Sequence, residues 1–99
     1  MLYAIISEDK PDSLQRRMAA RPDHLGRIKA LQDEGRLVLA GPHPAIDSED
    51  PGEAGFSGSL VVAEFDDLQS ARIWAVADPY IEADVYAKVT VKPFRKVLP

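Results

Sequence analysis

The chain has 99 residues, the size of one domain with a modest core, so we expect a single domain over residues 1–99. Hydrophobic residues make up 45% and charged residues 28%, which excludes disordered and fibrous classes, and the lack of cysteine excludes disulfides, thiolate zinc sites and thiol nucleophiles. The 12 basic and 16 acidic residues leave a net charge of -4, so neither nucleic acid nor an anionic membrane is an expected partner.

The first half of the chain predicts a strand, a long helix and a second strand. Residues 2–7 form a short apolar run without a basic segment before it, which indicates a strand and argues against a signal peptide. Cap and turn residues bound a predicted helix over residues 13–34, and residues 36–40 predict the second strand. Since no stretch approaches the length of a membrane span, we expect a cytoplasmic protein.

Pro22 stands inside the predicted helix. Proline suits the first position of a helix because it has no N–H to lose there, so we expect two helical pieces that meet near Arg21. His24 would then lie in the first turn of the second piece. Free N–H groups and the helix dipole disfavour a positive imidazolium at that position, and a neutral imidazole can accept a proton.

His24 also belongs to the apolar face of this helix. Ile28 and Leu31 follow it at i+4 and i+7, and Leu25 widens the stripe. A single histidine on such a face is more often a core or boundary residue than a catalyst. Spacing alone therefore leaves both interpretations open.

The second half begins with a long segment of no visible period, residues 42–58, which predicts a loop. Its acidic residues are Asp47, Glu49, Asp50 and Glu53. Their spacing fits no EF-hand, so we expect a solvated loop and no metal site. Beyond it we expect a strand at 59–65, a helix at 68–75, a helical turn at 80–84 and an alternating strand at 85–92.

This order of elements predicts an α+β, ferredoxin-like βαββαβ fold, in which four antiparallel strands carry the helices on one face. Residues 2–7 and 59–65 are apolar at consecutive positions, as in strands buried on both faces. The face without helices needs an apolar cover, because large exposed apolar patches are rare on monomers. A second copy of the sheet is the simplest cover, so we predict a homodimer.

Short motifs run along the whole chain. They are Asp9, Arg21-Pro22-x-His24-Leu25, Glu34-Gly35-Arg36-Leu37, Gly41-Pro42-x-Pro44-Ala45-Ile46-Asp47, Asp50-Pro51-Gly52-x-Ala54-Gly55-Phe56-x-Gly58-Ser59, Asp78-Pro79-Tyr80 and Val91-Lys92-Pro93-Phe94. In this combination the sequence resembles the YciI-like (YCII-related) family. The resemblance implies a ferredoxin-like fold of the dimeric α/β-barrel type and an active site built on a histidine and an aspartate, here His24 and Asp78. Some relatives are similar to lyases or dehydrochlorinases of small cyclic compounds, and related barrels include muconolactone isomerases.

The pair also has a physical rationale. Both helices of this fold lie on the same face of the sheet, so Asp78 can approach His24. A carboxylate that is hydrogen-bonded to one ring nitrogen fixes the tautomer and leaves the other nitrogen as a proton acceptor. The alternative is that Asp78 only ends its helix ahead of Pro79.

Five further residues are candidates for binding a substrate. Arg17 and Arg21 can hold a carboxylate or enolate, or can instead pair with nearby acids, of which Asp9 is one. Ser7, Asp9 and Tyr80 stand at strand and helix ends, where they line a pocket or serve as boundary residues. His43 lies in the predicted loop and is left out of the catalytic set.

Two functional hypotheses follow. The first is a small enzyme without a cofactor, in which His24 moves a proton on a small anionic or cyclic molecule in an elimination or isomerisation. No Gly-rich phosphate loop, nucleophile elbow or His-Glu-x-x-His motif is present. The second is a non-catalytic module for ligand binding or assembly, whose histidine only shapes the cleft.

Overall fold

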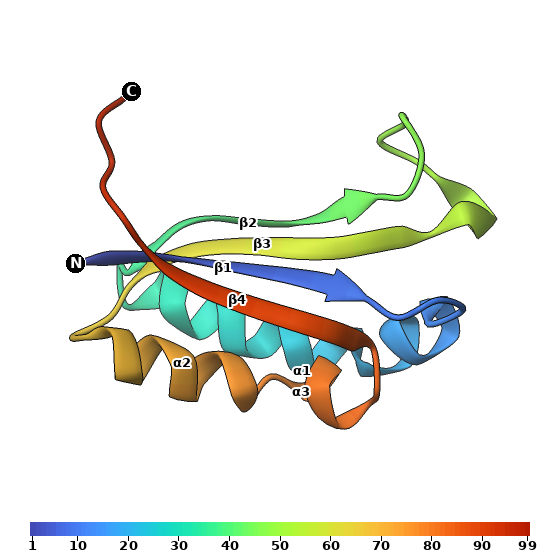
Figure 1. Cartoon of the computed structure of the whole chain (residues 1–99), viewed down its shortest axis with the longest axis horizontal. Helices are drawn as coiled ribbons and strands as arrows, with labels where there is room; N and C mark the ends of the chain where they lie inside the picture. The colour runs from blue at the N-terminus through green and yellow to red at the C-terminus, as the bar shows by residue number, and fades with distance from the viewer.

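The computed structural model describes residues 1–99 and shows a four-stranded antiparallel sheet with the helices on one face (Figure 1). The strand order is β2-β3-β1-β4. The elements are β1 (Leu2–Asp9), α1 (Leu14–Asp33), β2 (Leu37–Pro44), the short 3-10 helix η1 (Gly52–Ala54), β3 (Phe56–Glu64), α2 (Leu68–Val76), α3 (Pro79–Glu82) and β4 (Tyr86–Phe94). This confirms the predicted ferredoxin-like arrangement.

Helix α1 is one continuous helix of 20 residues with Pro22 in its interior, so the prediction of two pieces is wrong. Its buried side chains, which include Arg17 before Pro22 and Ile28 after it, pack toward the sheet on both sides of the proline. Together they outweigh the roughly 3 kcal/mol that an interior proline costs. His24 therefore lies in mid-helix, ten residues after the first residue of α1, and the free N–H groups of the helix start do not act on it.

The main core fills the space between the helices and the inner face of the sheet. Its members are Tyr3, Ile5, Ile28, Leu31, Val61, Ala63, Phe65, Ala71 and Ala75. A second, smaller cluster of Tyr80, Val85 and Tyr86 lies where α3 joins β4. Ala20 of α1 packs against the small cluster, so α3 lies beside the middle of α1.

Strands β2 and β3 extend into the segment that was predicted as a loop, which leaves only residues 45–55 between them. Pro42 pairs with Ser59 and His43 with Gly58. The sequence signal failed because prolines suggest a loop, whereas an edge strand tolerates proline wherever the missing N–H would face solvent.

Gly58 lets β3 approach β1 closely. A side-chain Cβ at this position would lie 1.9 Å from the main-chain oxygen of Ser7. Glycine is therefore required there for the two strands to pair.

Beyond Leu37, every residue of β2 is exposed. The helices thus leave this edge of the sheet open, and the candidate site lies there. None of the helices is both long and apolar enough to cross a membrane.

Candidate active site

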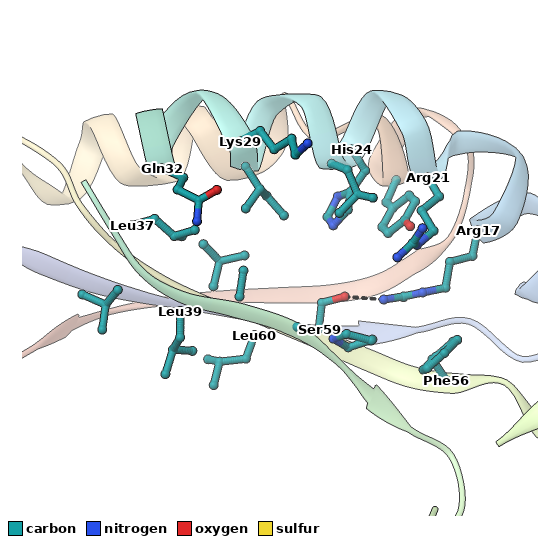
Figure 2. A pocket seen from close by; sticks show the side chains of 18 of the residues that line it. Arg17, Arg21, His24, Lys29, Gln32, Leu37, Leu39, Phe56, Ser59 and Leu60 are labelled. Atoms are coloured by element: carbon teal, nitrogen blue, oxygen red, sulfur yellow. Dashed lines mark hydrogen bonds between the residues drawn. The ribbon is translucent and has the colours of Figure 1, made fainter. Parts of the chain in front are cut away.

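A cavity of about 550 Å³ lies between α1 and the sheet edge formed by β2 and β3 (Figure 2). This volume is within the range of small-molecule sites. Its 19 lining residues include 11 hydrophobic ones, and none is an aspartate or glutamate. The side chains with polar groups are Arg17, Arg21, His24, Lys29, Gln32, Ser59 and Tyr80.

His24 lines this cavity and forms a buried pair with Asp78, which lies behind it. The Nδ1 of His24 lies 2.9 and 3.0 Å from the two carboxylate oxygens of Asp78, and the side chains are 8% and 6% exposed. A carboxylate only accepts hydrogen bonds, so Nδ1 carries a hydrogen and donates a hydrogen bond to Asp78. The tautomer of the ring is thereby fixed.

The second ring nitrogen of His24 faces a different environment. No protein group forms a hydrogen bond with Nε2, and the only fully enclosed side-chain polar atom without a partner is Nη1 of Arg27. Nε2 is therefore reached from the cavity, into which Figure 2 shows the imidazole turned. An unprotonated nitrogen in this position can take a proton from a bound molecule.

Asp78 does more than end the preceding helix, because its carboxylate has two hydrogen-bond donors. It is the N-cap of α3, where its Oδ1 accepts a hydrogen bond of 2.9 Å from the backbone N–H of Tyr80. The same carboxylate accepts from His24. The cap thus fixes the acid in the position from which it orients the imidazole.

Tyr80 forms the floor beneath the imidazole. Its ring stacks on that of His24 with centroids 3.9 Å apart and planes 10° apart, and the guanidinium of Arg17 lies 4.8 Å from its centroid. The residue is 1% exposed, and burial raises the pKa of its hydroxyl. Tyr80 therefore stays neutral and holds the histidine ring in one plane.

Both terminal nitrogens of Arg17 form hydrogen bonds with the protein. Its Nη1 donates to both oxygens of Asp9, at 2.7 and 2.9 Å, and its Nη2 donates to the hydroxyl of Ser59 at 2.6 Å and to the main-chain oxygen of Gly58 at 3.3 Å. Burial raises the pKa of Asp9, and the Arg17 guanidinium opposes that rise. Arg17 thus pairs with a local acid, and its remaining face borders the cavity.

Arg21 and Lys29 differ from Arg17 because neither forms an ion pair or a side-chain hydrogen bond with the protein. Both are exposed and both line the cavity. They are therefore free to bind an anion.

Of the seven residues singled out from the sequence, the structure brings five to this site. His24, Arg17, Arg21 and Tyr80 line the cavity, and Asp78 lies directly behind His24. Asp9 lies behind Arg17 and borders a separate hollow, and Ser7 is buried opposite Ser59 in the sheet.

Sequence reasoning missed Lys29, Gln32 and Ser59. The two helical residues follow Arg21 at eight and eleven positions, which places them on the same side of α1, so the helical period contained that signal. Nothing in the local pattern around Ser59 indicated its bond to Arg17, which joins residues 42 positions apart.

A family model described as the YCII-related domain matches residues 1–95. The chain belongs to the YCII family. Two curated relatives named Protein YciI, from Escherichia coli and Shigella flexneri, are 60% identical over 97 residues, which covers 98% of this chain and 99% of each relative. A further curated relative, from Haemophilus influenzae, is 58% identical over 97 residues, which covers 98% of this chain and 99% of the relative.

Solved structures show the same architecture. The dehydrochlorinase of 5-chloro-2-hydroxyhydroquinone from Burkholderia phenoliruptrix, in complex with 2,5-dihydroxybenzoquinone, superposes with a TM-score of 0.83 at 23% identity and covers 96% of this chain and 94% of its own. An antibiotic biosynthesis monooxygenase has a TM-score of 0.51 at 17% identity, with 99% and 100% coverage. At such identities the likeness establishes the fold alone, so this YCII protein has the fold of the dimeric α/β barrels.

Proposed function

We propose that this YCII-family protein is an enzyme without a cofactor that transfers a proton on a small anionic organic molecule, in a reaction of the lyase or isomerase type. The observation that carries the proposal is the oriented His24–Asp78 pair, whose free nitrogen opens into a cavity without acidic residues. A dehydrochlorinase with this fold is named for an elimination on a small hydroxylated ring. One general base and one cation are suited to catalyse such a reaction.

In this proposal Nε2 of His24 takes a proton from a carbon next to a carbonyl or carboxylate group. Arg21 stabilises the negative charge that develops on the substrate oxygen, and Asp78 stabilises the imidazolium that forms. In an isomerisation, the imidazolium of His24 returns the proton to another carbon of the substrate. In an elimination, the electron pair expels a leaving group, and the imidazolium releases its proton to solvent.

The test is solvent deuterium exchange, which reports the proton transfer before the physiological substrate is known. The protein is incubated in deuterated buffer with a panel of small carboxylated ketones, enols and lactones, and loss of the carbon-bound proton signal is followed by NMR. We expect exchange with at least one compound and a loss of about 10²–10⁴-fold in His24→Gln. Asp78→Asn should lower the rate and also shift its pH profile, because the tautomer is no longer fixed.

His43→Gln is the matched control, because His43 is exposed on β2 and does not line the cavity. This variant should exchange at the rate of the wild type. Equal rates in wild type and His24→Gln, for every compound that exchanges, would refute the proposal.

The second candidate is a non-catalytic binding module. The burial of His24 and Asp78 favours it, because a pair that also caps α3 stabilises the fold without any chemistry. Under this hypothesis His24→Gln lowers the melting temperature and ligand affinity together, and no compound exchanges.

We also propose that the protein is a homodimer whose subunits pack through the sheet face opposite the helices. In β1, Tyr3 and Ile5 enter the core, so the alternate residues Ala4 and Ile6 lie on the outer face. Figure 2 shows Leu39 and Leu60 pointing away from α1 toward the same face. An apolar surface of this kind is usually covered.

Light scattering with size-exclusion chromatography tests the dimer. Ile6→Lys should convert a dimer to a monomer, whereas Ile73→Lys should not, since Ile73 is 60% exposed on α2. A monomeric wild type would contradict the proposal.

A further inference from the structure

The cavity is positive although the protein is acidic. The chain has 16 acidic and 12 basic residues, yet the cavity lining contains Arg17, Arg21 and Lys29 and no acid. Asp9 matches the charge of Arg17. Two unpaired cations therefore remain, Arg21 and Lys29.

These two cations stand on opposite sides of the histidine. Arg21 precedes His24 by three residues and Lys29 follows it by five, which at 1.5 Å per residue corresponds to about 4.5 and 7.5 Å along the helix axis. Figure 2 shows the same order along α1, with Arg21 on one side of His24 and Lys29 on the other. A molecule that contacts both cations must extend past the imidazole.

The wall between the two cations is apolar. Leu25 and Ile28 contribute from α1, and Leu37 and Ala40 contribute from β2. Such a wall can pack against the carbon skeleton of a ligand, and the cations can bind anionic groups at the two ends of that skeleton.

We infer that the ligand of this cavity is a small organic dianion, with one anionic group at Arg21 and the other at Lys29. The placement of its reacting carbon at His24 rests on the proposed function, but the binding itself does not require catalysis. Lys29 is then the residue that distinguishes a dianion from a monoanion of the same length.

Titration calorimetry with adipate and hexanoate tests this inference, because the two probes share a chain length and differ by one carboxylate. The wild type should bind adipate about tenfold more tightly than hexanoate. Lys29→Met should remove this preference and leave hexanoate binding unchanged. Arg21→Gln should weaken the binding of both probes, or allow adipate to bind only as a monoanion at Lys29.

Lys92→Met is the matched control, because it removes the same charge from an exposed position on β4 outside the cavity. It should retain the preference for adipate. Equal affinities in the wild type, an equal loss in Lys29→Met and Lys92→Met, or no binding of either probe would each overturn the inference.

The outcomes also separate this inference from the proposed function. A Lys29-dependent preference for adipate, in a protein that exchanges no proton, supports the dianion site and refutes the enzyme. Exchange that depends on His24, without a preference for adipate, supports the enzyme and refutes the dianion site.

Discussion

The buried pair of Arg17 and Asp9 allows the most quantitative prediction. Replacing Arg17 by methionine keeps much of the side-chain volume but removes the guanidinium. The Asp9 carboxylate would then lose two hydrogen bonds of 2.7 and 2.9 Å, and Ser59 would lose one of 2.6 Å. The loss leaves a charge buried without a partner.

The expected loss of stability in Arg17→Met follows from the burial of the pair. The side chains of Arg17 and Asp9 are 5% and 2% exposed, so solvent screens the charges little. Removing one partner of such a pair costs about 3–5 kcal/mol of the free energy of unfolding. For a domain of this length we expect the melting temperature to fall by at least about 12 °C.

The pH dependence of this loss has a definite sign. Burial raises the pKa of Asp9 above its ordinary value of 3.8, and the Arg17 guanidinium lowers it in part, so Arg17→Met raises this pKa further. A carboxyl group with a raised pKa stabilises the fold when protonated, and that stability is lost as the pH rises through the raised pKa. The difference between wild type and variant should therefore be larger at pH 7 than at pH 4.

Urea denaturation at both pH values measures these differences. The matched variant is the double substitution Asp9→Asn with Arg17→Met, which removes the buried charge as well. It should be more stable than Arg17→Met alone by at least about 1 kcal/mol at pH 7 and should not depend on the ionisation of residue 9. A loss below about 1 kcal/mol in the single variant, or a double variant no more stable than the single one, would refute the reasoning.

Three further changes have expected outcomes. Gly58→Ala should lower the melting temperature strongly, because its Cβ would meet a main-chain oxygen of β1, whereas Gly26→Ala, with open space around it, should raise it slightly. Burial raises the pKa of Tyr86 from 10.0 to about 12, so in urea denaturation the wild type should lose at most about 3 kcal/mol relative to Tyr86→Phe as the pH rises from 10 to 12. Arg27 lies over the ring of Trp74 at 4.4 Å and donates to its main-chain oxygen, so Arg27→Ala should shift the Trp74 emission to the red and cost about 1 kcal/mol of stability. An unchanged emission spectrum would show that the stacking is absent in solution.

Local pattern was sufficient to predict the order of strands and helices. The clean alternation of the last strand and the helical spacing of His24, Ile28 and Leu31 are set by which side chains face the core, and the structure places Ile28 and Leu31 in that core. The pairing of His24 with Asp78 needed the fold as well, because the two residues are 54 positions apart.

Local sequence pattern did not predict the features that tertiary packing determines, namely the continuity of α1, the length of β2 and the cavity. Pro22 signals a break, but the stripe that packs on both sides of it keeps α1 intact. Pro42 and Pro44 signal a loop, but an edge strand accepts them. The helical period puts Lys29 on the side of α1 that carries Arg21. The cavity itself depends on the distance between α1 and β2, which no short stretch of sequence specifies, so Lys29 was not recognised as part of its lining.

Because α1 is continuous, it fixes the spacing and direction of the side chains that line the cavity. Each residue added to an α-helix turns everything beyond it by about 100°, so one insertion between Arg21 and Lys29 would carry the lysine round to another side. In the proposed dianion site, the eight-residue interval between these cations would determine ligand choice as much as the side chains themselves. By contrast, residues 45–55 connect two paired strands and can lengthen or shorten without altering that interval.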